Sequence, residues 1–202
     1  MIRFPVRAKN RKELERMGRP LGAATEAIPH CYFDTAAYTS GTTTSLTFFT
    51  TTRDNRQLSN LSPAGQLPDP YFFEIYGFGF EPLVKPAAGV WTDYWQLVYG
   101  AGGTNAAPTF TFFLSDKEYP GPVPLSLLHA TGGPVGFSDA AAAPEQYMNN
   151  SVPDGSWYID GAIVIPPSNG FRATINWEDA LTLTADCKVR VSMWGVLHRK
   201  VL

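Results

Sequence analysis

Residues 171–177 read FRATINW, and this stretch decides the fold class. The four odd-numbered positions carry apolar side chains, and the three positions between them carry polar ones. A period of two places one set of side chains against a core and the other in water, which is typical of a half-buried β-strand. The run WYIDGAIVI at 157–165 comes just before, and the turn-forming PPSNG at 166–170 separates the two segments. The C-terminal third therefore predicts successive β-strands.

Similar β signals extend through most of the chain, because Thr, Val and aromatic residues gather in short runs between turn-forming residues. Gly77 and Gly79 lie inside one such run and predict a bulge or a close backbone approach, and Gly195 predicts a bend in the last run. The glycine-rich loop at 100–107 indicates a hairpin between its flanking strands. The expected strands cover 45–53, 71–81, 93–99, 109–114, 157–165, 171–177, 181–184 and 189–197.

These strands predict an all-β fold, a single jelly-roll-like β-sandwich of about eight antiparallel strands with a basic N-terminal arm. A chain of 202 residues is long enough for one core and short for two. We expect the arm and a connector (21–41) within 1–41, and the sandwich at 42–202 with a long loop insertion at 116–156. The insertion holds one short expected strand at 125–129. Ordered loops of this length are commonly functional, and a merely decorative loop is the equal alternative.

Charge separates the arm from the body. The net charge of -2 combines +5 over residues 1–20 with -7 over residues 21–202. The arm is therefore expected to be attracted to polyanions, which the body repels. Its expected partners are a neighbouring subunit, an inner membrane or nucleic acid. The arm residues expected to make these contacts are Arg3, Arg7, Lys9, Arg11, Lys12, Arg16 and Arg19.

The sequence contains no recognisable catalytic or metal-binding motif, which predicts a protein without enzymatic activity, metal or cofactor. His30 stands next to Cys31, but neighbours on an extended chain point in opposite directions, so we expect a buried thiol and not a catalytic dyad. Cys187 lies too far along the chain to suggest a disulfide framework. Without an apolar run typical of a signal peptide or membrane helix, the chain is expected to stay in a reducing cytosol until assembly or release.

The aromatic side chains have two expected locations. Those inside the strand patterns are expected in the core. Those at strand ends and in loops suit stacking on carbohydrate or burial in a protein interface. We favour the interface, because fixed assemblies use aromatic anchors and no polar sugar-binding cluster is recognisable. The candidate interface aromatics are Trp91, Tyr94, Trp95, Tyr147 and Trp157.

The run IVIPPSNGFRATINWEDALTLTADCKVRVSMWGVLHRKVL at 163–202 resembles the closing strands of single jelly-roll capsid proteins of tailless icosahedral viruses and phages. The strand FFEIYGFGFEP at 72–82 resembles an earlier strand of the same fold, so the resemblance covers 42–202 in outline. It implies a virion structural protein of a bacterial or archaeal virus. Such a subunit would self-associate into capsomers and contact other capsid proteins, with no small-molecule substrate. It would be assembled in the host cytoplasm and remain in the virion.

Two other classes of protein compete with this interpretation. The first is a carbohydrate- or receptor-binding β-sandwich module of a virus spike or tail. The second is an enzyme of the sandwich or cupin kind, which the scattered histidines disfavour because cupin chemistry needs clustered metal ligands. The sequence leaves open a glycosidase-like pair among the carboxylates Glu74, Glu81, Asp93 and Asp160.

Overall fold

The computed structural model describes residues 25–84, 90–101, 107–119, 121–128 and 157–200. Within these ranges the chain forms nine β-strands, one α-helix and one short 3-10 helix. In chain order they are β1 (Thr25–Tyr38), β2 (Ser45–Phe48), β3 (Phe72–Leu83), α2 (Val90–Tyr99), β4 (Thr109–Leu114), β5 (Lys117–Glu118), β6 (Val123–Pro124), η1 (Leu125–Leu127), β7 (Trp157–Ile165), β8 (Phe171–Asn176) and β9 (Cys187–Lys200).

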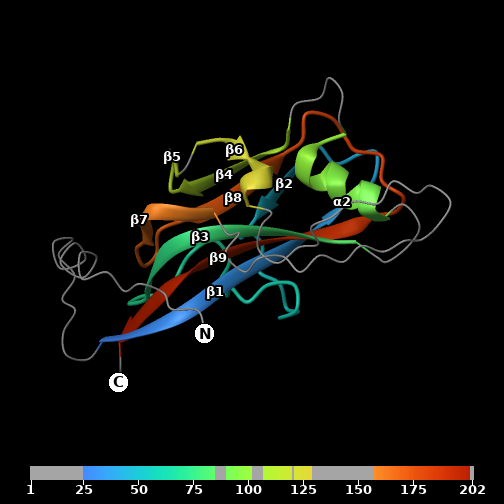
Figure 1. Cartoon of the computed structure of the whole chain (residues 1–202). Coiled ribbons are helices and arrows are strands. Elements are labelled where there is room, and N and C mark those ends of the chain that lie inside the picture. The colour runs from blue at the N-terminus through green and yellow to red at the C-terminus, as the bar shows by residue number, and fades with distance from the viewer. Residues whose placement is uncertain (1–24, 85–89, 102–106, 120, 129–156, 201–202) are drawn as a thin grey trace.

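The strands form two antiparallel sheets that pack as an all-β sandwich (Figure 1). The first sheet has the order β1-β9-β3-β7, and β1 pairs with β9 from Thr25↔Lys200 to Tyr38↔Cys187. The second sheet has the order β2-β8-β4-β5, with β6 also pairing with β4. All described strand pairs are antiparallel. The all-β prediction is therefore confirmed.

Aromatic rings fill the space between the two sheets. Phe78 of β3 lies with its ring centroid 5.0 Å from those of both Phe110 and Phe112 of β4, so these three rings join one sheet to the other. β8 alternates as its sequence predicts, with Phe171, Ala173 and Ile175 buried. Rings of this size bury 150–250 Å² each, and their burial is the main hydrophobic stabilisation of the sandwich.

The predicted irregularity in β3 is confirmed. The register of β3 against β9 shifts between Ile75 and Gly77, so β3 has one extra residue there. Opposite this bulge, Gly195 of β9 approaches the backbone of β3, and a Cβ built on Gly195 would lie 1.7 Å from the carbonyl oxygen of Glu74. Gly195 therefore permits a close approach of two backbones within a continuous strand, where the sequence had predicted a bend.

The strand predicted at 93–99 is wrong, because this segment lies in the helix α2. Tyr94, Leu97 and Val98 are buried at the i, i+3, i+4 spacing that places them on one helix face. The β-favouring aromatic and branched residues of the segment misled the prediction, since packing of this face overrides local propensity. The hairpin predicted across 100–107 is wrong for the same reason: the element before the loop is a helix.

Other elements also differ from the prediction, and the expected loop insertion at 116–156 begins with the short strands β5 and β6. The expected connector contains the strand β1, where Pro29 is tolerated because β1 is the edge strand of its sheet. β2 stops at Phe48, since Phe49 adopts a φ of 67°. The segment 181–184 is not a strand, and 125–127 is a 3-10 helix. The basic arm lies outside the described residues, as does the part of the insertion at 129–156.

Candidate interaction surface

The helix α2 lies at one end of the sandwich and is fixed there by polar contacts (Figure 1). The indole N–H of Trp177 donates a hydrogen bond of 3.1 Å to the carbonyl oxygen of Leu97. At the first turn, both carboxylate oxygens of Asp93 accept the backbone N–H of Thr184 at 3.0 Å. The helix ends at Tyr99, and the next residue, Gly100, has a φ of 86°, which suits a glycine just after a helix. These contacts hold the helix in one orientation.

Two aromatic side chains face outward from this helix. Trp95 and Tyr99 are one helical turn apart, and their rings stack with centroids 4.1 Å apart and an interplanar angle of 27°. Trp95 is 46% exposed and Tyr99 is 37% exposed. We call the outward-facing pair Trp95 and Tyr99 the aromatic surface. Large rings held rigidly at a surface are typical anchors of protein interfaces.

The predicted interface aromatics divide into three groups. Trp95 lies on the aromatic surface. Tyr94 is 4% exposed and packs in the core, so its place on an outer surface was predicted wrongly; a helix turns neighbouring side chains by about 100°. Trp91 lies in α2 and Trp157 in β7, but their side chains are outside the described part, as is the whole of Tyr147. The predicted arm residues also lie outside the described residues.

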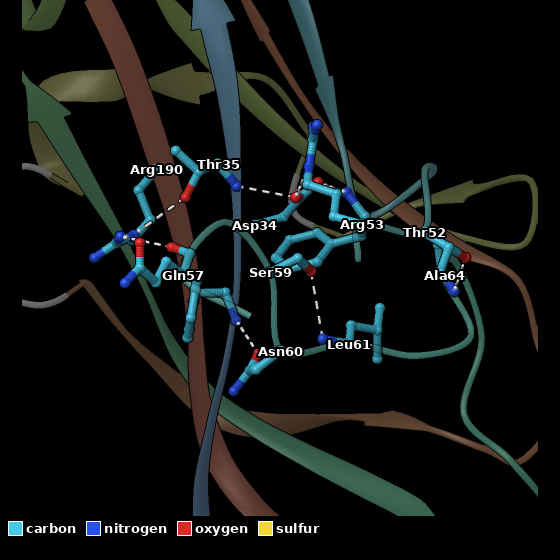
Figure 2. Close-up of polar contacts among 12 residues, drawn as sticks. Asp34, Thr35, Thr52, Arg53, Gln57, Ser59, Asn60, Leu61, Ala64 and Arg190 are labelled. Carbon is cyan, nitrogen blue, oxygen red and sulfur yellow. Dashed lines mark hydrogen bonds and ion pairs between the residues drawn. The ribbon is translucent and has the colours of Figure 1, made fainter. Parts of the chain in front are cut away.

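Apart from the aromatic surface, a region of polar contacts covers the outer edge of β1 (Figure 2). It is formed by residues 49–61, here called the edge loop. The side-chain oxygen of Asn60 accepts the backbone N–H of Phe33 at 2.8 Å, and its amide donates to the carbonyl of Cys31 at 2.7 Å. Asn60 thus takes the place of a neighbouring strand. This edge of the sheet is covered there and does not offer free backbone groups to another chain.

Asp34 anchors the start of the edge loop. Its carboxylate, 1% exposed, forms an ion pair of 2.7 Å with Nε of Arg53 and accepts the backbone N–H of Phe49 at 2.7 Å (Figure 2). It also accepts the N–H of Thr35 at 2.9 Å. The bond to Phe49 fixes the residue whose positive φ ends β2. The buried charge therefore determines where the chain leaves the second sheet.

Arg190 of β9 ties the edge loop to the outer face of the first sheet. Its guanidinium donates to the hydroxyl of Thr35 and to the carbonyl of Gln57, each at 3.2 Å (Figure 2). It also lies 4.9 Å from the centroid of the Phe33 ring and 3.4 Å from a carboxylate oxygen of Glu81. Glu81 of the possible glycosidase pair is thus bound in this network.

A buried pair of titratable side chains joins β3 to β9. Nε2 of His198 lies 3.3 Å from Oε1 of Glu74, and the ring of Phe72 stacks on the imidazole at 4.3 Å. The hydroxyl of Tyr76 donates to the other carboxylate oxygen of Glu74. The phenol thus contacts the carboxylate, and the pair of Glu74 and His198 links two neighbouring strands.

The two cysteines have weakly acidic thiols. Burial raises the pKa of Cys31 to about 11, and burial with the nearby carboxylates of Asp93 and Asp186 raises the pKa of Cys187 to about 11. Both thiols are free. His30 points to the rings of Tyr32 and Phe73, and burial lowers its pKa. Because their pKa values are raised, the thiols of Cys31 and Cys187 are poor nucleophiles at neutral pH, since the thiolate is the reactive form.

Alkylation of the folded protein should reflect these pKa values. An unperturbed thiol has a pKa of about 8.5, so a pKa near 11 lowers the thiolate fraction at pH 7.5 by more than about 100-fold. We expect iodoacetamide to modify Cys31 and Cys187 at least 100-fold more slowly in the native protein than in urea. Mass spectrometry of timed samples measures both rates. Equal rates in the two states would contradict the buried thiols.

In the described ranges, no group of three or more His, Cys, Asp and Glu side chains is placed to hold a metal ion. No helix in the described part of the chain has the length and apolar content to span a membrane. Comparisons with protein-family models, curated proteins and solved structures give no match.

Proposed function

We propose that the protein is the structural subunit of a virus shell, a jelly roll without catalytic activity that assembles through contacts with other copies and with other capsid proteins. The observation that carries the proposal is the order in which the strands pair. A bacterial or archaeal virus is the source that the resemblance favours, and the virion, assembled in the host cytoplasm, is the proposed location.

The pairing order is nested. β1 pairs with β9, β2 with β8, β3 with β7, and β4 with β5. If the two-residue β6 is set aside, eight described strands remain, of which the first pairs with the last, the second with the seventh, and so on inward. The chain is then one long antiparallel hairpin rolled across two sheets. This order supports a jelly roll, an architecture found in viral capsids, lectins and cupins.

The filling of the sandwich favours a binding protein over a cupin-like enzyme. A cupin holds its metal and substrate between the sheets, where this chain places Phe48, Phe78, Phe80, Phe110 and Phe112, each at most 1% exposed. Close-packed rings occupy the volume that a substrate would need. The outer surfaces of the sandwich are then the part of the protein that can bind partners, and a shell subunit makes its contacts through such surfaces.

Electron microscopy of the purified full-length protein tests the proposal. Rings, capsomers or shells at high protein concentration are the expected result. Dispersed monomers at every concentration and salt condition would contradict it. A glycan array on the same sample tests the carbohydrate-binding alternative, which the stacked rings of Trp95 and Tyr99 favour because such pairs also stack on sugars. If the protein binds a glycan saturably and forms no particles in the microscope, the carbohydrate-binding alternative replaces the proposal of a shell subunit.

Deletion of residues 2–20 should weaken assembly while leaving the sandwich folded. The strands and the core that the structure describes lie within 25–200, so we expect the sandwich to fold without the deleted residues. We expect circular dichroism typical of β-sheet to persist, and the size of particles in light scattering to fall. Unchanged assembly would show that the basic arm makes no essential contact between subunits.

A further inference from the structure

The aromatic surface stands in an acidic part of the body. The helix at 90–99 and the segment at 177–186 together contain four carboxylates and no Lys or Arg. Asp93 is buried, whereas Glu178, Asp179 and Asp186 are exposed. The two segments are joined by the bonds from Trp177 to Leu97 and from Thr184 to Asp93. This end of the sandwich therefore combines stacked rings with exposed negative charge.

Residues 1–20 have the complementary chemistry. They carry five arginines and two lysines against two glutamates. An arginine side chain both pairs with carboxylates and stacks on aromatic rings. The body already uses this contact, since the guanidinium carbon of Arg172 lies 4.2 Å from the centroid of the Phe113 ring. A basic segment of this composition matches a surface of rings flanked by carboxylates.

The position at which the arm joins the sandwich favours a contact between copies. The arm leads into Thr25, opposite Lys200, whereas α2 and the acidic segment lie beyond the other end of the β1–β9 pair (Figure 1). Fourteen strand residues span about 45 Å. An arm folding back along its own body would need about half of the 24 residues that precede Thr25 to cover that distance, which removes Arg16 and Arg19 from the contact. A second copy placed end to end needs no such span.

We propose that the aromatic surface receives the basic arm, residues 1–20, of a second copy of the chain, so that subunits associate head to tail. The inference rests on the proposed function and names the surface through which the copies meet. A contact of this kind uses different patches on its two sides, so it can close into rings. Because ion pairs contribute to it, raising the salt concentration should weaken it.

Two double variants of the full chain test the contact by sedimentation velocity. Trp95→Ala/Tyr99→Ala removes the stacked rings, and Arg16→Glu/Arg19→Glu reverses charge in the arm. Each double variant, measured by itself, should show a dissociation constant for self-association at least tenfold higher than that of the wild type. An equimolar mixture should form a heterodimer, because each variant keeps the half that the other lacks. The matched control is Tyr119→Ala, which should associate like the wild type. Tyr119 is 39% exposed and directly follows β5, a strand of the second sheet that lies away from α2 (Figure 1).

The possible outcomes separate the two proposals. If the variants associate as strongly as the wild type, or if their mixture forms no heterodimer, the arm does not bind this surface, although particle formation by the wild type would still support the shell function. If the wild type is monomeric throughout, both proposals fail. Thermal unfolding of each variant, with a midpoint close to that of the wild type, shows that any lost association is not lost folding.

Discussion

Replacing Gly195 with alanine should lower the free energy of unfolding by about 3 kcal/mol, the upper end of the usual range for overpacking. The added Cβ would lie 1.7 Å from the carbonyl oxygen of Glu74 and 2.7 Å from its carbonyl carbon. Both atoms belong to backbone in the centre of the first sheet, so neither can turn aside as a flexible side chain would. Relief requires β3 and β9 to separate at the bulge.

Gly170→Ala is the matched control for this prediction. A Cβ on Gly170 would meet its nearest neighbour, the carbonyl oxygen of Gly65, at 3.9 Å, which is ordinary van der Waals contact. Its effect should stay within about 1 kcal/mol. Urea denaturation followed by tryptophan fluorescence measures both variants. Similar losses at the two glycines would contradict the close approach of β9 to β3.

Replacing Asp34 with alanine should also destabilise the protein by about 3 kcal/mol, because removal of this buried carboxylate leaves the groups that it binds unsatisfied. The backbone N–H groups of Thr35 and Phe49 would lose their acceptor, and Arg53 would lose its counter-charge. Asp34→Asn should be intermediate, since its amide oxygen still accepts one of these bonds.

The exposed ion pair between Glu26 and Arg199 provides the comparison. It has a similar N···O distance, 2.9 Å, but its side chains are 45% and 46% exposed. Glu26→Ala should therefore change the free energy of unfolding by less than about 1 kcal/mol. Urea denaturation at low and moderate salt measures both variants. An Asp34→Ala protein as stable as Glu26→Ala would show that the edge loop does not depend on the buried carboxylate.

The sequence predicts best those elements whose surroundings alternate regularly. The alternation in β8 and in the first part of β9 is visible locally, because one face lies on the core and the other is more exposed, and both strands are found where expected. The bulge in β3 was also predicted, from Gly77. α2 was not, because its helical state depends on burial of Tyr94, Leu97 and Val98 against residues far along the chain.

The polar contacts that connect distant segments could not be predicted in the same way. Asp34 and Arg53 belong to different elements, and only the folded chain places them 2.7 Å apart. The pair Glu74 and His198 likewise depends on the register of β3 against β9. For the aromatic surface a signal was present, since Trp95 and Tyr99 have the i, i+4 spacing of a helix face, but the strand assignment concealed it. The role of the basic arm stays a prediction.

The position of β9 has a consequence for the timing of folding. β9 lies between β1 and β3, so the first sheet has no centre until this segment has been synthesised. Before that moment β1 and β3 both have unpaired edges, and pairing partners so distant in sequence form slowly. A nascent chain that still lacks β9 therefore cannot complete the first sheet, and its exposed strand edges should make it most prone to aggregation at that stage.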